Sequence, residues 1–202
     1  MNLLMHLQQI NFGDKTPRLQ GRLNLNPLSH IDPMGFIFLI VAGFGWGKPV
    51  QIDSRNFNGK YSLSKAEAIV AVAGPIMNFI LAFVFLILYY ILFFTFKVFN
   101  GLSAEWYAYV NQIFIYIVTI NIGLGVFNLI PLPPLDGSKV LMHFLPSKAK
   151  MSFYKYQEAF YFAFVIILIT GLADVVIVPI FNLLFSGMNW LVYALLNLVK
   201  LI

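Results

Sequence analysis

The stretch AIVAVAGPIMNFILAFVFLILYYILFFTF, residues 68–96, runs for 29 positions without a charged side chain. A helix of about 20 apolar residues is long enough to cross the hydrocarbon core of a bilayer. Residues 106–135 form a second window without a charge, and residues 159–199 form a third that contains only Asp174. The apolar run 36–44 is too short to cross and is typical of a re-entrant, interfacial or strand segment. We therefore expect about three to four membrane segments.

The overall composition excludes an ordinary soluble domain. Hydrophobic residues make up 60% of the chain and charged residues only 10%, whereas soluble domains are about 25% charged. The same values exclude an intrinsically disordered protein, which needs low hydrophobicity and high charge. The sequence has no cysteine, which excludes a disulfide framework and a cysteine-ligated zinc site.

The basic residues lie in the loops between the apolar windows. Residues 14–65 carry seven lysines and arginines, and residues 139–155 carry four, whereas the short loop 97–105 carries one. Two membrane segments separate the two basic regions, so both regions fall on the same side, which the positive-inside rule predicts to be the cytoplasm. We interpret the net charge of +5 as a signal of orientation in a cell membrane rather than of nucleic-acid binding.

These observations predict an all-α polytopic membrane protein with a small β element near the cytoplasmic face. Leu23 and Leu25 alternate with polar residues as in a short strand, and residues 44–50 suggest a bend followed by an edge strand over 50–52. At the other end of the chain, Pro179 and the pair Ser186-Gly187 favour a break in the third window.

One membrane domain over residues 1–202 is expected, and its segments follow the sequence pattern. They are residues 19–65 as a β or re-entrant segment, 66–99 as a membrane helix, 106–135 as a membrane helix that ends in a proline-rich break, 136–158 as a cytoplasmic loop, and 159–202 as one or more C-terminal membrane helices.

The stretch NLIPLPPLDG, residues 128–137, is the strongest candidate for chemistry. Its prolines break any helix there, and the freed carbonyl groups at membrane depth must face protein or a water-filled cavity. Asp136 lies just beyond the break, and a carboxylate at this depth is costly unless a cation or a metal ion pairs with it. The alternative is an ordinary surface loop in which Asp136 is solvated.

Two further stretches carry polar groups. In AGPIMN, residues 73–78, Gly74 permits close approach of another helix, Pro75 kinks the helix, and Asn78 shares the face of Gly74. Asn78 is suited to bind a substrate carbonyl or, as favoured by the residues alone, to link neighbouring helices. In residues 21–35, His30 and Asp32 are a weak metal signal, and turn formation is the preferred interpretation.

Six motifs in one order make this chain resemble a known family, the site-2 protease family of intramembrane zinc metalloproteases. The resemblance is strongest to the short bacterial members that lack a PDZ domain, and it covers roughly residues 12–145. The motifs are FGD at 12–14, GRLNLNP at 21–27, HIDP at 30–33, FGWGKPV at 44–50, AGP with Asn78 at 73–78, and FNLIP with LDG at 127–137.

The resemblance implies a zinc-dependent cleavage of membrane-anchored proteins within the bilayer. The family binds zinc through two histidines of an HExxH helix and an aspartate of an LDG-type motif, which Asp136 matches here. The glutamate of HExxH is the base for the metal-bound water. Asn78 and Asn128, together with Gly74 and Pro75, would shape the site or hold the substrate backbone.

The chain departs from the family because it contains no HExxH. The family places this motif just before the Gly-Asp that matches Gly13-Asp14, so residues 1–18 correspond to a remnant of the first catalytic helix and its turn. His6 is the candidate for the second histidine, although its distance to Gly13 is one residue shorter than the family spacing. Asn2 and Leu3 would then replace the first histidine and the glutamate, and a leucine is no base. We expect weak zinc binding and no peptide hydrolysis.

Three explanations of this departure remain open. In the first, the chain is incomplete or altered at its N-terminus and derives from an active protease. In the second, it is a pseudoprotease that binds membrane proteins without cutting them. In the third, it is a membrane protein of another kind, such as a transporter subunit, although the apolar windows contain few charges for an ion path.

Overall fold

The computed structural model of the chain describes residues 1–42, 45–95 and 97–201 and confirms an all-α polytopic membrane fold. Within these residues, three helical segments are long and apolar enough to cross a membrane. The first is α4 (Leu63–Tyr90), which η3 (Ile91–Thr95) extends by one π-helical turn. The other two are α5 (Ala104–Asn128) and α9 (Leu172–Leu198).

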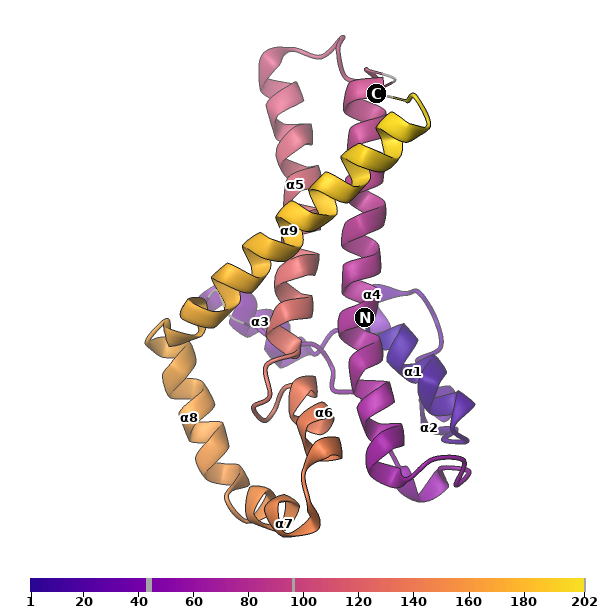
Figure 1. The fold of residues 1–202 in the computed structure, drawn as a ribbon, viewed down its shortest axis with the longest axis vertical. Coiled ribbons are helices and arrows are strands. Elements are labelled where there is room, and N and C mark those ends of the chain that lie inside the picture. Colours follow the sequence, from indigo (N-terminus) through magenta and orange to yellow (C-terminus); the bar gives the residue numbers. More distant parts are fainter. Residues whose placement is uncertain (43–44, 96, 202) are drawn as a thin grey trace.

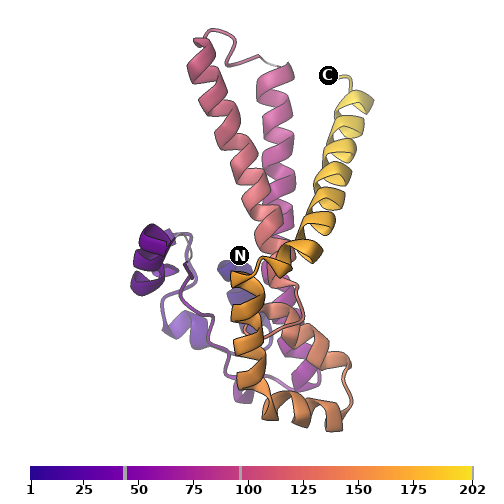
Figure 2. The same ribbon diagram turned by 90° about the vertical axis from the view of Figure 1, so that its left-hand side faces the viewer.

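The long helices form one end of the molecule. Helices α4 and α5 run antiparallel side by side, and α9 crosses them diagonally (Figures 1 and 2). Apolar side chains fill the contact between the three helices because each helix presents a buried stripe to the other two. The residues of this core are Ala82 and Leu86 on α4, Val118, Ile122 and Val126 on α5, and Val192 and Leu196 on α9.

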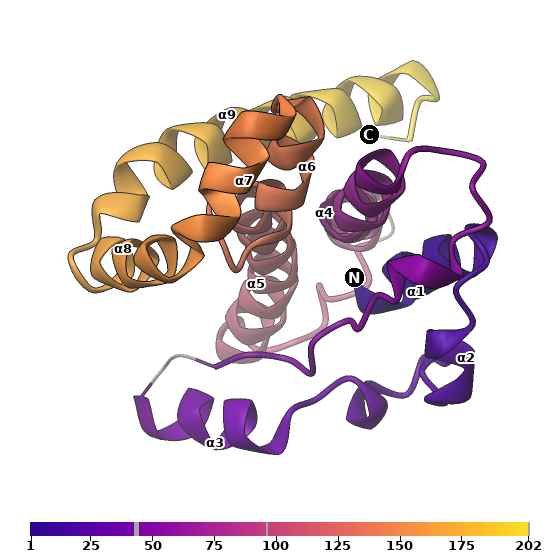
Figure 3. The same ribbon diagram turned by 90° about the horizontal axis from the view of Figure 1, so that it is seen from below.

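At the opposite end, α1 (Asn2–Asn11) and α6 (Asp136–Phe144) lie beside the first half of α4, whereas α3 (Pro33–Ala42) and α8 (Gln157–Ile169) lie farther from it (Figure 3). Helices α1 and α6 both pack against α4. Met5 of α1 and Phe12, which directly follows α1, are buried with Ala66, Val70 and Ala73 of α4 in a second apolar core. This arrangement brings the start of the chain next to the beginning of α6, more than 120 residues later in the sequence.

Short elements complete this end of the molecule. They are α2 (Thr16–Leu19), η1 (Pro27–Ser29), α3 (Pro33–Ala42), η2 (Ser54–Asn56), α7 (Ser147–Lys155) and α8 (Gln157–Ile169).

The predicted β element is wrong for the part of the chain that the structure describes. Residues 23–25 form bends, and the only bridge described there joins Ile31 to Gly47. The side chain of Asn24 bonds to the backbone of Gly21 and Asn26, which turns the chain and replaces a strand ladder.

The predicted edge strand at residues 50–52 is absent for a related reason. Gln9 Nε2 donates to the carbonyl of Gln51 at 2.7 Å, and the backbone N–H of Asp53 donates to Asp14 Oδ2 at 3.0 Å. Side chains of the N-terminal segment therefore take the backbone groups that a neighbouring strand would need.

The apolar run 36–44 belongs largely to α3, a helix of ten residues. Such a helix is about 15 Å long, half of the hydrocarbon thickness, so it does not cross. Most of its side chains are exposed, including Phe36, Ile40 and Val41. Residues 43 and 44 lie outside the described residues, and so does the start of the bend predicted for 44–50.

The third apolar window is interrupted, but not where its sequence suggested. Helix α8 ends at Ile169, and α9 begins at Leu172 and continues through Pro179 and the Ser186-Gly187 pair to Leu198. Pro179 lies inside α9, and the helix continues on both sides of it. The segment 136–158, expected as a loop, consists mainly of α6 and α7.

Candidate functional site

Asp136 is the first residue of α6, directly after the proline-rich break that follows α5. The break allows the chain to fold back so closely that a Cβ at Gly137 would lie 2.2 Å from the carbonyl oxygen of Leu129. Only glycine fits that approach. The carboxylate is thereby held at the start of a helix, where the N-terminal N–H groups favour a negative charge.

Asp136 lines a cavity of about 430 Å³ between the end of α5, the start of α6 and the start of α1. Asn128 lies on the wall formed by α5, and Lys139 lies one turn along α6. The remaining lining residues are Met1, Asn2 and Met5 of α1, Trp46, Gly47, Lys48, Pro49 and Val50 of the preceding loop, and Pro134. A larger cavity of about 540 Å³ borders it and shares Val50, Pro134 and Lys139.

The thioether of Met1 lies between side-chain amides of two membrane helices. Asn78 Nδ2 on α4 lies 3.6 Å from Met1 Sδ, and Asn128 Nδ2 on α5 lies 3.8 Å from the same sulfur. Asn78 is only 2% exposed. A Cβ at Gly74 would lie 3.0 Å from Met5 Sδ and 3.1 Å from Met1 Cγ, so the glycine lets α1 lie directly on α4.

The Asp136 carboxylate is buried and only partly compensated. Burial raises the pKa of Asp136 above its ordinary value, and the nearby positive charge of Lys139 lowers it by less. Lys139 Nζ lies 3.6 Å from Asp136 Oδ1, but this lysine is more than a third exposed. An under-compensated carboxylate next to a cavity is typical of a binding or catalytic site.

His6 lies on another face of α1 and does not reach this cavity. Its Nδ1 donates to Gln9 Oε1 at 2.9 Å, and its ring faces that of His30 with centroids 5.9 Å apart. His30 Nε2 donates to the carbonyl of Asn24 at 3.0 Å. His6 Nε2 and His30 Nδ1 are buried, and the residues that the structure describes offer neither of them a hydrogen-bond partner. Burial lowers the pKa of His6, the Gln9 hydrogen bond raises it, and the charges of Arg22 and His30 lower it further.

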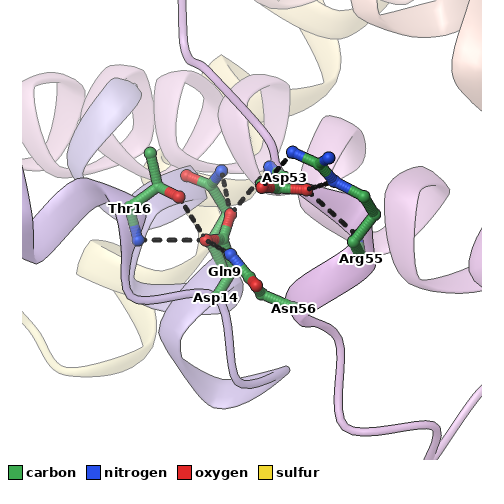
Figure 4. A network of polar contacts seen from close by, with 6 residues as sticks. All are labelled: Gln9, Asp14, Thr16, Asp53, Arg55 and Asn56. Atoms are coloured by element: carbon green, nitrogen blue, oxygen red, sulfur yellow. Dashed lines mark hydrogen bonds and ion pairs between the residues drawn. The ribbon is translucent and has the colours of Figure 1, made fainter.

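A second polar cluster on α1 has the opposite character (Figure 4). Asp14 is fully buried, and its carboxylate accepts hydrogen bonds from Gln9 Nε2, from the backbone N–H and hydroxyl of Thr16, from the backbone N–H of Asp53, and from Asn56 Nδ2. These bonds tie the end of α1 to the start of α2 and to the loop before α4. Because these bonds join three segments of the chain, we infer that this cluster stabilises the fold.

The residues around Asp136 do not fit a zinc ion. Catalytic zinc sites use three protein ligands from histidine, cysteine and carboxylate side chains. Among residues 1–42, 45–95 and 97–201, no three such groups come together. The cavity that Asp136 lines is instead bordered by two thioethers and a carboxamide, those of Met1, Met5 and Asn2.

The site residues predicted from the sequence are thus partly brought together. Asp136 and Asn128 line one cavity, and Asn78 and Gly74 reach its edge through contacts with Met1. Pro75 is buried within a continuous α4. His6 is separate. Met1, Met5 and Lys139 were missed, although the i, i+4 spacing of the two methionines and the short spacing of His6 to Gly13 were signals in the sequence.

The fold and this cavity define a polytopic membrane protein in which the carboxylate of Asp136 lines a cavity at the break after α5. The model of peptidase family M50, the site-2 protease family, matches residues 36–171, and the chain belongs to this family. No solved structure matches the chain at a significant level.

Three curated proteins are similar to the chain. "Putative zinc metalloprotease YwhC" of Bacillus subtilis is 36% identical over 175 residues, which cover 85% of this chain and 75% of that protein. "Putative zinc metalloprotease Rip2" of Mycolicibacterium smegmatis is 27% identical over 169 residues, which cover 79% of this chain and 58% of that protein. "Putative zinc metalloprotease MJ0611" of Methanocaldococcus jannaschii is 36% identical over 108 residues, which cover 54% of this chain and 49% of that protein.

Proposed function

We propose that this chain binds membrane-anchored protein segments at an intramembrane site of the zinc-metalloprotease type, and that its 202 residues do not hydrolyse them. Family membership supports the first part of the proposal. The observation that carries it is the cavity beside Asp136, which lies where α5 ends and a backbone break exposes polar groups. Extended peptide backbone needs such polar groups when it leaves a helix in the bilayer.

The second part of the proposal follows from the residues in the cavity. Zinc is the metal that the names of the relatives carry, and a catalytic zinc needs three protein ligands and a base for its water. Of these groups, the sequence has Asp136 and no HExxH. Hydrolysis is therefore proposed only for a chain in which the missing ligands and base are present.

Capture of a model substrate tests this proposal. A single-span peptide with a photoreactive residue at its centre should cross-link to the wall of the Asp136 cavity when it is mixed with the chain in lipid vesicles. Filling the cavity by Asn2→Trp should reduce the yield several-fold. Leu19→Trp, at a residue that is 86% exposed on α2, is the matched control and should leave the yield unchanged.

The two parts of the proposal have separate contradicting results. Cross-links outside the cavity, or equal yields for both tryptophan variants, would contradict binding at this site. Cleavage of the peptide by the native chain, lost on Asp136→Ala, would contradict the absence of hydrolysis.

We also propose that the two basic regions, residues 14–65 and 139–155, face the cytoplasm of a bacterial cell. The reason is the positive-inside rule applied to residues 14–65 and 139–155. The chain has no cysteine, so single cysteines report the side directly. Lys148→Cys, on α7, should be labelled only after the cells are opened, whereas Asn100→Cys, in the loop between η3 and α5, should be labelled in intact cells. The reverse pattern would contradict the orientation.

A further inference from the structure

We infer that Met1, the N-cap residue of α1, together with Asn2 and Met5 of α1, occupies the three positions from which a metal-binding helix would face Asp136, and that His6 does not belong to this site. The inference rests on the proposed function, because that function gives the Asp136 cavity its meaning. The inference specifies how this chain differs from a zinc protease. Two thioethers occupy the positions of two zinc ligands, and a carboxamide occupies the position of the base.

The face of α1 follows from contacts on three sides. Met1 Sδ lies within 3.8 Å of the amide nitrogens of Asn78 and Asn128. Met5 is only 2% exposed and lies against Gly74. Asn2 lines the same cavity as Asp136. These three positions therefore share the side of α1 that faces α4, α5 and the start of α6.

Leu3 and His6 lie on the neighbouring side of α1. Leu3 borders a cavity of about 320 Å³ with Asn24 and His30, and Met1 and Asn2 border this cavity as well. Leu3 and His6 do not line the Asp136 cavity, and His6 faces the His30 ring. An α-helix advances by about 100° per residue, so positions 1, 2 and 5 fall within about 100° of arc, whereas positions 3 and 6 fall outside it. The lining of the Asp136 cavity thus agrees with helix geometry: positions 1, 2 and 5 line it, positions 3 and 6 do not, and Met1 and Asn2 lie at the edge between the two cavities.

The spacing of the three residues has a chemical meaning. Positions i and i+4 present two side chains to one ion, and position i+1 lies beside the ion, which is the geometry that a His-Glu-x-x-His helix uses. Met1 and Met5 occupy i and i+4, and Asn2 occupies i+1. Thioethers are soft ligands that suit monovalent copper better than zinc, and a carboxamide does not accept a proton at neutral pH. Lys139 supplies the positive charge near Asp136.

Two rebuilt variants distinguish the faces of α1. The first carries Met1→His, Asn2→Glu and Met5→His. The second carries Asn2→His and Leu3→Glu and uses the native His6, so it contains the same motif one residue later. Both are produced behind the same short N-terminal tag, and the tagged native chain is the reference. Zinc is measured by metal analysis after purification in detergent with zinc and removal of free metal.

The first variant should hold about one zinc per molecule, because it completes three ligands with Asp136. The second variant and the native chain should hold well under one. Adding Asp136→Asn to the first variant should remove most of its zinc. Equal binding by the two variants, stronger binding by the second, or binding by the first that survives Asp136→Asn would overturn the inference.

A cross-linking measurement on otherwise native chains covers the case in which the rebuilt variants do not fold. Because the chain has no cysteine, the pairs Asn2→Cys with Asp136→Cys and Leu3→Cys with Asp136→Cys can be compared directly. A short bifunctional maleimide should join the first pair and leave the second largely unjoined. Efficient joining of the second pair alone would overturn the inference.

These measurements need no substrate, so they are independent of the peptide-capture experiment. If peptide capture fails but the first variant binds zinc through Asp136, the proposed function is wrong and the assignment of the α1 face stands. If capture succeeds and the second variant binds zinc instead, the proposed function stands and the assignment of the α1 face is wrong.

Discussion

Asp14 and Asp136 are both buried carboxylates near α1, but their surroundings differ greatly. Asp14 is 0% exposed and accepts hydrogen bonds from four residues. Asp136 is 9% exposed, and the described residues give its carboxylate one ion pair, with Lys139 at 3.6 Å. One carboxylate is thus saturated by donors that belong to the fold, and the other has capacity for a further partner.

The difference distinguishes a carboxylate that stabilises the fold from a carboxylate that is available to bind a ligand. A saturated buried carboxylate stabilises the fold, because its removal leaves several donors without a partner. An under-compensated carboxylate weakens the fold in its charged form and is retained where a ligand completes it. Asp14 and Asp136 should therefore respond to substitution with opposite signs.

The largest expected effect is that of Asp14→Ala. The substitution removes the acceptor of the Thr16 and Asp53 donors and one of the two acceptors of Gln9 Nε2, which keeps its bond to Gln51. We therefore expect a loss of about 3 kcal/mol of unfolding free energy. For a chain of this size the unfolding temperature should fall by roughly 6–12 °C. Thermal unfolding in detergent, followed by circular dichroism, measures the change.

Asp53→Ala is the matched control for this prediction. It removes a carboxylate of the same cluster but keeps the backbone N–H that Asp14 uses. Its own partner is the exposed Arg55, and exposed pairs contribute little, so the unfolding temperature should hardly change. Equal losses for Asp14→Ala and Asp53→Ala would contradict the structural assignment of Asp14.

The second effect concerns the close backbone approach that places Asp136. Gly137→Ala would put a Cβ 2.2 Å from the carbonyl oxygen of Leu129 and 2.5 Å from that of Ile130, and both atoms belong to the backbone. We expect a loss of about 1–3 kcal/mol from this overpacking. Thermal unfolding and, in the first rebuilt variant, zinc content should both decrease.

Gly123→Ala provides the control, because a Cβ there meets nothing within 4 Å. It lies inside α5, where alanine is favoured over glycine by about 1 kcal/mol, so stability should be unchanged or slightly higher. A stable Gly137→Ala variant with full zinc binding in the rebuilt background would show that the tight break does not position Asp136.

The membrane fold was predictable from the sequence, because apolar length alone decides whether a helix can cross a bilayer. Asp136 was predictable as a candidate because prolines end α5 just before it. The break in the third window was not, since Pro179 is accommodated inside α9 while α8 ends at Ile169. The β element was wrong because side chains such as Asn24 and Gln9 take the backbone bonds that strands would need.

The side of α1 that faces the Asp136 cavity could not be predicted from the sequence, for a different reason. Motif spacing drew attention to His6 because histidine is the residue type that binds zinc. Which side chains meet Asp136 depends on how α1 lies on Gly74 and Asn78, and these residues are about 70 positions away in the chain. Methionine and asparagine are not residue types that indicate a zinc site in a sequence. The positions of Met1, Asn2 and Met5 beside Asp136 are therefore evident only from the packing in the structure.

A third, smaller effect is expected from pH. Burial lowers the pKa of His6, so the folded state disfavours the imidazolium, whereas the unfolded chain takes up a proton near the ordinary value of 6.5. Stability is therefore lost as the pH falls below about 6.5, with a slope of at most about 1.4 kcal/mol per pH unit. The charges of Arg22 and His30 also oppose protonation of the ring.

Unfolding temperatures of the native chain and of His6→Gln between pH 8 and pH 5 measure this effect. The native chain should lose stability over this interval more steeply than the variant, which has no group that titrates at this position. Identical slopes for the two chains would show that another group governs the acid sensitivity.

The smallest effect, with the opposite sign to that of Asp14→Ala, is expected for Asp136→Asn. Burial raises the pKa of Asp136 above its ordinary value of 3.8, so between these two values the folded state binds more protons than the unfolded state. Stability of the native chain therefore falls as the pH rises through this interval, and the penalty remains at higher pH.

Asparagine has the same shape without the charge, but it loses the pair with Lys139, which is partly exposed and weak. At pH 7 the variant should be as stable as the native chain or more stable by less than about 1 kcal/mol. Near pH 3 the two chains should coincide, because Asp136 is then protonated. A loss of several degrees on Asp136→Asn at pH 7 would place Asp136 with Asp14, as a carboxylate that the fold itself requires.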